Sequence, residues 1–139
     1  MLSRDQIRTA VAAAIAAAGL AGCAPKPVAP VVPITSTSAF VGSWAGTWDC
    51  RWERGTTTFA VTPDGKFTGT MHSTMIGKTW SFTGSLADGV FTGQVPDSPT
   101  NIYVLNGSAA VYGGRELKSQ GAIHLKGKPL GNCVFDVKR

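Results

Sequence analysis

The chain has 139 residues and a formal net charge of +5, a length that suits one small domain but not two. Glycine is abundant at 17 residues, and many short segments between Gly, Asp-Gly and Pro turns favour an all-β fold. The basic residues are spread along the chain rather than clustered, which argues against nucleic acid as a partner because such binding needs a basic stripe or arm.

Residues 1–22 have the pattern of an export signal. Arg4 and Arg8 give the segment a positive start, and the stretch from Ala10 to Leu20 is apolar and rich in alanine. This stretch is well short of the ~20 residues that a membrane-spanning helix needs. We therefore expect a cleaved targeting segment rather than a permanent membrane span.

The end of this segment carries a recognisable processing motif. Leu20-Ala21-Gly22-Cys23 resembles the bacterial lipobox, in which a leucine, a small residue and a glycine or alanine precede an invariant cysteine. The resemblance implies that Cys23 becomes the first residue and carries a diacylglycerol and an acylated amino group, enough for stable anchoring. Ala24, rather than aspartate, follows the cysteine, which resembles Gram-negative lipoproteins of the outer membrane. The implied place of the folded domain is the periplasm.

Residues 23–39 are predicted to form a tether between this anchor and a folded domain. Four prolines punctuate its first part: Pro25, Pro27, Pro30 and Pro33. Because proline fixes φ and lacks an N–H donor, this part favours extended polyproline II over a helix or an inner strand. The run Thr35–Ser38 is expected to be flexible linker.

Residues 40–139 are predicted to form the folded domain, because apolar and polar residues alternate there with the period of a β-strand. Pro63-Asp64-Gly65 and Ala87-Asp88-Gly89 are typical of turns and hairpins. The expected strands are 42–53, 56–62, 67–71, 80–86, 91–95, 102–105, 117–125 and 133–137. Residues 106–114 are ambiguous. Short connections predict a small antiparallel up-and-down β-barrel of about eight strands, since closure removes exposed sheet edges.

The first expected strand has an apolar and a polar face. Its inward positions are Trp44, Gly46, Trp48, Cys50 and Trp52. On the outward parity, Asp49, Arg51 and Glu53 are expected to form a surface charge ladder. Later segments repeat a Phe-Thr-Gly pattern, which indicates aromatic side chains that cover strand glycines and a sheet that curves.

Two cysteines remain once Cys23 is assigned to the anchor. Cys50 and Cys133 lie on the inward parity of the first and last expected strands, and an exported protein meets an oxidising compartment. A disulfide between them would tie together the two strands that close the barrel. The alternative is a pair of buried free thiols.

Gly42-Ser43-Trp44 is similar to the Gly-x-Trp signature of the calycin group, which includes lipocalins and avidins, and in which the tryptophan closes the barrel floor. The segment Gly65–Thr70 also resembles the second hairpin of avidins. Small bacterial inhibitors of secreted metalloproteases share this start and this architecture. The resemblance implies a calycin-like barrel with Trp44 at its floor.

Catalytic and metal-binding patterns are not found in the sequence. His72 and His124 fall on outward parities and in no metal-ligand spacing, and the carboxylates are scattered or sit in turns. There is no nucleophile elbow and no phosphate loop. We therefore expect no cofactor, no metal and no enzymatic activity.

Three functions stay open. The first is a binding or inhibitory module toward another cell-envelope protein, with contacts from the loops at 73–78, 96–101 and 107–114. The second is a carrier of a small apolar ligand, in a cavity lined by Trp44, Trp52, Phe59, Trp80 and Phe91. The alternative for these aromatics is simple core filling, which we expect because about a hundred residues leave little room for a void. The third is a structural subunit of an envelope complex.

Overall fold

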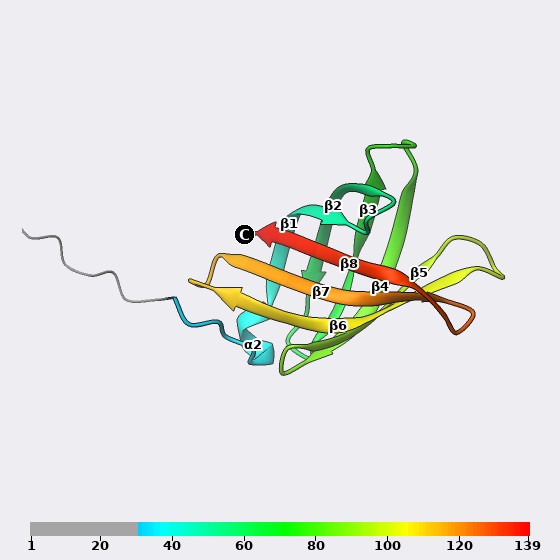
Figure 1. The fold of residues 1–139 in the computed structure, drawn as a ribbon. Helices are drawn as coiled ribbons and strands as arrows, with labels where there is room; N and C mark the ends of the chain where they lie inside the picture. Colours follow the sequence, from blue (N-terminus) through cyan, green and yellow to red (C-terminus); the bar gives the residue numbers. More distant parts are fainter. Residues whose placement is uncertain (1–30) are drawn as a thin grey trace, which may run out of the picture. The chain divides into compact units, whose positions relative to one another are not determined.

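A computed structural model describes residues 31–139. Eight antiparallel strands close into a single up-and-down barrel, each strand pairing with the next and β8 returning to β1 (Figure 1). The strands are β1 (Gly42–Asp49), β2 (Arg54–Val61), β3 (Lys66–Ser73), β4 (Thr79–Ala87), β5 (Val90–Pro96), β6 (Ile102–Tyr112), β7 (Glu116–Leu125) and β8 (Lys128–Lys138). The fold class predicted from the sequence is confirmed.

The expected export signal, Cys23 and the first part of the tether lie outside the described residues. Between residues 31 and 139, no helix is long and apolar enough to cross a membrane.

Closure of the barrel is made by the pairing of β1 with β8, which runs from Ala45 opposite Lys138 to Asp49 opposite Val134. Just past the end of β1, Cys50 forms a disulfide with Cys133 of β8. Both cysteines are buried. The predicted disulfide is therefore confirmed, and it extends the seam between the first and last strands by a covalent link.

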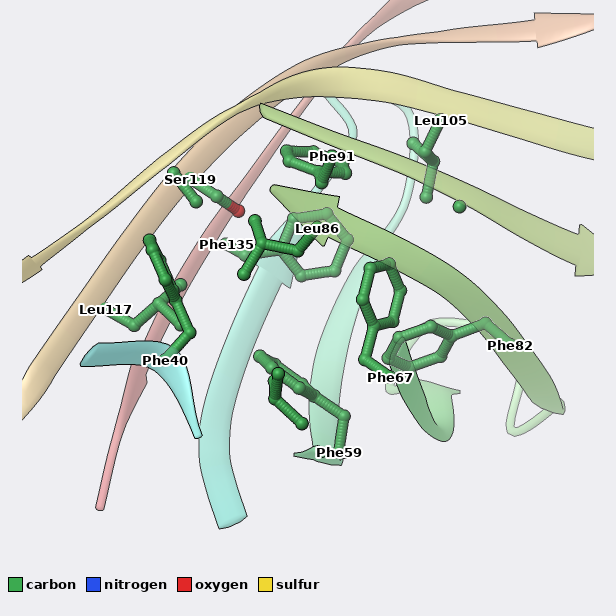
Figure 2. Close-up of a pocket in the computed structure, with 13 residues that line it drawn as sticks. Phe40, Phe59, Phe67, Phe82, Leu86, Phe91, Leu105, Leu117, Ser119 and Phe135 are labelled. Atoms are coloured by element: carbon green, nitrogen blue, oxygen red, sulfur yellow. The ribbon is translucent and has the colours of Figure 1, made fainter. Parts of the chain in front are cut away.

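The interior of the barrel is filled largely by aromatic side chains. The rings of Phe59, Phe67 and Phe82 form a triangle with centroid separations of 5.9 to 6.4 Å (Figure 2). A Cβ added at Gly84 would lie 2.2 Å from Cζ of Phe67, so this ring lies directly on the glycine backbone. The Phe-Thr-Gly segments thus pair an inward aromatic ring with an inward glycine, and the missing side chain makes room for the ring.

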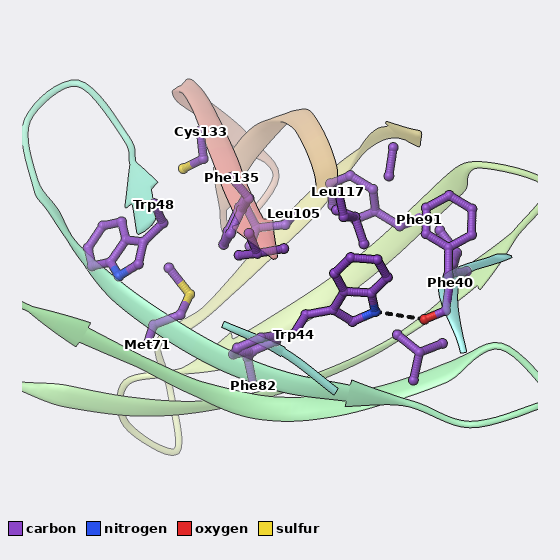
Figure 3. Packing of buried hydrophobic residues seen from close by; sticks show 14 of the residues in the cluster. Phe40, Trp44, Trp48, Met71, Phe82, Phe91, Leu105, Leu117, Cys133 and Phe135 are labelled. Carbon is purple, nitrogen blue, oxygen red and sulfur yellow. Dashed lines mark hydrogen bonds between the residues drawn. The ribbon is translucent and has the colours of Figure 1, made fainter. Parts of the chain in front are cut away.

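One end of the barrel, the closed end, is sealed by the short helix α2 (Thr37–Phe40). Phe40 is 0% exposed, and the indole Nε1 of Trp44 donates a 2.7 Å hydrogen bond to its carbonyl oxygen (Figure 3). The guanidinium of Arg139 lies 4.5 Å from the Trp44 ring centroid and donates to the Val41 carbonyl. Trp44 is therefore held on both sides at the barrel floor.

Part of the segment expected as tether is packed on the barrel. Ile34 exchanges two backbone hydrogen bonds of 2.8 Å with Val111 of β6, and Thr37 Oγ1 accepts one from the Asp88 backbone N–H at 3.2 Å. The compact unit begins at Val31, whereas the sequence placed the domain boundary at residue 40. The run expected as flexible linker overlaps the start of α2, and it is held to the barrel by the Thr37 contact and by the pairing of the preceding Ile34.

Two strand boundaries also differ from the sequence expectation. β1 ends at Asp49 instead of continuing to residue 53, because Arg51 has a φ of 75° and the Cys50 backbone N–H bonds the Glu53 carbonyl in a tight turn. β6 runs to Tyr112, through most of the stretch 107–114 that was expected as a loop. That stretch is rich in small residues, and ten residues of β6 pair with β7 in continuous register.

Candidate functional site

The interior of the barrel has a small hollow next to the closed end. Its volume is about 50 Å³, and its lining is apolar except for Ser119 (Figure 2). Phe59 and Phe91 line it, whereas Trp44 packs below it in the floor. Because typical small-molecule sites occupy roughly 300–1,000 Å³, this hollow does not hold a ligand of that size. These aromatics fill the core in the present structure.

A second hollow, of about 120 Å³, lies at the opposite end of the barrel. We call this the open end; it is formed by the turns that follow β1, β3, β5 and β7, which share one end in an up-and-down barrel. The hollow is defined here as the aromatic bowl, and its polar and aromatic lining consists of Trp48, Trp52, Glu53, Trp80 and Tyr103. Aliphatic side chains and the Cys50 sulfur complete its wall.

Two tryptophans of the bowl are fixed by hydrogen bonds. Trp48 Nε1 donates to the Thr56 carbonyl at 3.0 Å, and Trp80 Nε1 donates to Asp97 Oδ1 at 2.8 Å. Their rings meet edge to face, with centroids 6.3 Å apart and an interplanar angle of 79°. Since both indole N–H groups have partners, the two rings present apolar surface to the bowl in fixed positions.

The rim beside Trp80 carries an ion pair. Lys78, in the turn after β3, pairs with Asp97, in the loop after β5, and its Nζ lies 5.4 Å from the Trp80 ring centroid. The Lys78 ammonium and, secondarily, the Trp80 indole hold the pKa of the Asp97 carboxyl below its ordinary value. The interaction links two loops of the open end and neutralises both charges locally.

Trp52 lies at the edge of the bowl and not inside the barrel. It is 45% exposed, and a Cβ added at Gly131 would come within 2.8 Å of its Cζ3 atom. Gly131 has a φ of 147°, a conformation that favours glycine. The indole therefore packs on bare backbone of β8. The sequence placed Trp52 inward by extending β1, and the turn at Arg51 is the reason that this placement is wrong.

Glu53 is the residue of the bowl that sequence analysis missed. It was expected on an outward charge ladder with Asp49 and Arg51, but the turn at Arg51 brings it into the lining of the bowl. Its Oε1 atom is buried and has no hydrogen-bond partner within the described protein. Alternation along a strand contains no signal for this position, because the strand ends before it.

Apolar side chains are exposed at the open end, and two of them, Trp52 and Leu130, also line the bowl. Of the ten large hydrophobic residues that are exposed in the described chain, five lie at the open end: Trp52, Met75, Ile76, Ile102 and Leu130. We call these five the hydrophobic rim. Three of the remainder belong to the segment before α2, and the other two are Val90 and Val134. The loops at 73–78 and 96–101 adjoin this rim, as the topology requires.

The expected contact loop at 107–114 is not part of this end. Most of it belongs to β6, and its turn at Gly113 and Gly114 lies at the closed end. Residues 31–139 contain no cluster of three or more His, Cys, Asp or Glu side chains that would hold a metal ion. His72 Nδ1 is 2.8 Å from Thr79 Oγ1 on the outer surface.

No family model matches the chain, and no curated protein matches it. A redesigned β-barrel of known structure is similar at a TM-score of 0.49 and 12% sequence identity, over 76% of this chain and 96% of that one. The barrel described above stands on its own strand pairing.

Proposed function

We propose that this protein is a non-enzymatic binding module, lipid-anchored to the outer membrane, whose open end contacts another cell-envelope protein. The observation that carries the proposal is the hydrophobic rim around the aromatic bowl. Apolar side chains gathered at one end of a protein among polar residues favour an interaction site, and tryptophan is enriched among the residues that dominate binding energy.

The proposed anchor is compatible with this arrangement. The described chain begins near the closed end, where Ile34 pairs with Val111, so residue 31 and the rim lie toward opposite ends of the barrel. A calycin-like relationship, proposed from Gly42-Ser43-Trp44, is supported by the position of Trp44 in the floor. Intact mass spectrometry of protein from host membranes tests the anchor: loss of residues 1–22 and added lipid are expected, and an unmodified chain overturns it.

The carrier alternative is less favoured by the geometry. The hollow of about 50 Å³ next to the closed end is too small, and the bowl of about 120 Å³ suits one side chain better than a whole apolar ligand. A module that receives part of a larger partner accounts for both the bowl and the rim.

Site-specific photo-crosslinking in host cells tests the docking surface. A photoreactive residue at Ile76, 64% exposed in the rim, is compared with one at Val90, 66% exposed near the closed end. We expect a discrete protein adduct from position 76 that is absent from position 90. Equal adducts from both positions, or none from position 76 at full expression of folded protein, would overturn the proposal.

A further inference from the structure

The lining of the aromatic bowl carries one uncompensated polar feature. Among the described residues that line it, Glu53 is the charged one, and its Oε1 atom is shielded from solvent without any hydrogen-bond donor. A carboxylate with one oxygen in this state gains from any donor that the Glu53 side chain meets in the bowl. A positively charged donor satisfies a carboxylate best, since a charge-assisted hydrogen bond is stronger than a neutral one.

The rest of the lining suits the same class of ligand. Trp48, Trp52, Trp80 and Tyr103 contribute aromatic rings to the bowl, and the faces of such rings attract ammonium and guanidinium groups. The protein already uses this interaction within its own structure: a lysine lies 5.4 Å from the Trp80 ring and an arginine 4.5 Å from the Trp44 ring.

The volume of the bowl limits the size of the guest. About 120 Å³ is far below the roughly 300–1,000 Å³ of sites for whole small molecules. A single alkyl chain that ends in a cationic group matches the bowl, with the methylenes against the apolar wall and the cation at Glu53.

From these observations we infer that the aromatic bowl receives the alkylammonium or guanidinium group of a lysine or arginine side chain that the partner protein presents. This inference rests on the proposed function, and it names the group by which the partner is recognised.

The charges outside the bowl indicate the surroundings of that side chain. Arg51, Arg54, Lys126 and Lys128 are exposed in or beside the turns of the open end, whereas Asp97 is already paired. These four basic groups outnumber the acidic groups at this end, the exposed Asp49 included, and they oppose the approach of a bare cation within a Debye length of about 8 Å. The favoured partner segment therefore has its basic residue flanked by acidic residues that face these four groups.

A titration of the intrinsic tryptophan fluorescence of the mature chain tests the inference. The probes are n-butylammonium and n-butanol, together with two pentapeptides that carry central lysine or norleucine between glutamates. We expect the lysine peptide to bind roughly tenfold or more tightly than the norleucine peptide, from the combined carboxylate and aromatic contacts. We also expect it to bind more tightly than free n-butylammonium.

Two variants assign the effect to the bowl. Glu53→Gln keeps the size of the side chain and is expected to abolish the preference for lysine over norleucine. The matched control is Asp136→Asn, which removes an exposed carboxylate on the outer face of β8 and is expected to change nothing. Trp52→Leu, at an exposed position, reduces the aromatic surface without disturbing the core. It is expected to weaken the binding of both cationic probes, n-butylammonium and the lysine peptide.

Each contrary result is informative. Equal binding of lysine and norleucine peptides, or an unchanged preference in folded Glu53→Gln, would overturn the inference. Tighter binding of free n-butylammonium than of the peptide would overturn the assignment to a partner side chain. If the Ile76 crosslink persists while the cation preference is absent, the docking surface stands and the inference alone fails; loss of the crosslink refutes the proposed function instead.

Discussion

Reduction of the disulfide between Cys50 and Cys133 is predicted to remove a large share of the stability of the barrel. The two residues are 83 positions apart, so the link closes nearly the whole domain into one loop. It also lies just beyond the pairing that joins β1 to β8, which runs from Ala45 to Asp49 on β1. Without it, the seam of the barrel depends on hydrogen bonds and packing alone.

The magnitude follows from the length of this loop. In the chain-entropy model, a cross-link that closes 83 residues destabilises the unfolded state by about 4.5 kcal/mol at 25 °C. Small domains have total stabilities of about 5–15 kcal/mol, so the reduced protein is expected to be marginal. For a domain of about a hundred residues, this difference lowers the melting temperature by about 20 °C or more.

Thermal and urea denaturation with and without a thiol reductant measures this difference. Reduction leaves both buried side chains in place and so isolates the cross-link from cavity effects. The control is the double variant Cys50→Ala with Cys133→Ala, whose melting temperature should not respond to the reductant. A shift below about 5 °C in the wild-type chain, with reduction verified by mass, would refute the entropic argument.

Three further predictions concern the two ends of the barrel. Trp44→Phe leaves the buried Phe40 carbonyl without its 2.7 Å donor and is expected to cost about 1–3 kcal/mol of unfolding free energy in urea; an unchanged midpoint would contradict it. Gly131→Ala places an alanine at a φ of 147°, with its Cβ 2.8 Å from the Trp52 ring. We expect it to lower the free energy of unfolding by about 1–3 kcal/mol and to shift the tryptophan emission to the red. Unchanged emission would contradict the packing of Trp52 on Gly131. The Lys78 ion pair and the Trp80 hydrogen bond lower the pKa of Asp97 from 3.8. They stabilise the fold above pH 3.8, and this stabilisation is lost as the pH falls through the lowered pKa. Tryptophan emission should therefore change below pH 3.8 in the wild type and not in Asp97→Asn.

The alternation of apolar and polar residues was sufficient to predict the barrel. The prediction that Trp44, Cys50 and Cys133 point into the barrel was right, because these residues lie on or directly beside strands with one buried face. Once the inward faces of the first and last strands are known, closure brings the two cysteines together. Patterns of this kind are reliable because a shift of one residue would turn every apolar side chain to solvent.

The features that the sequence did not predict depend on single backbone conformations or on distant partners. Arg51 adopts a positive φ that is uncommon for a residue other than glycine, and the tight turn around it moves Trp52 and Glu53 from the expected strand into the open end. The contact of Ile34 with Val111 joins residues far apart in the chain. Local composition contains neither kind of information.

The two ends of the barrel differ in how completely their polar groups are satisfied, and this difference is the strongest argument for function at the open end. At the closed end, the Trp44 indole has its acceptor and its ring is covered by a guanidinium, as folding stability alone requires. At the open end, Trp52 is exposed and Glu53 Oε1 is buried without a donor. An exposed indole and a buried oxygen without a donor add little to the stability of the isolated domain, and we infer that both become favourable when a cationic, partly apolar group fills the bowl. The buried oxygen without a donor and the exposed indole therefore lie together at the open end.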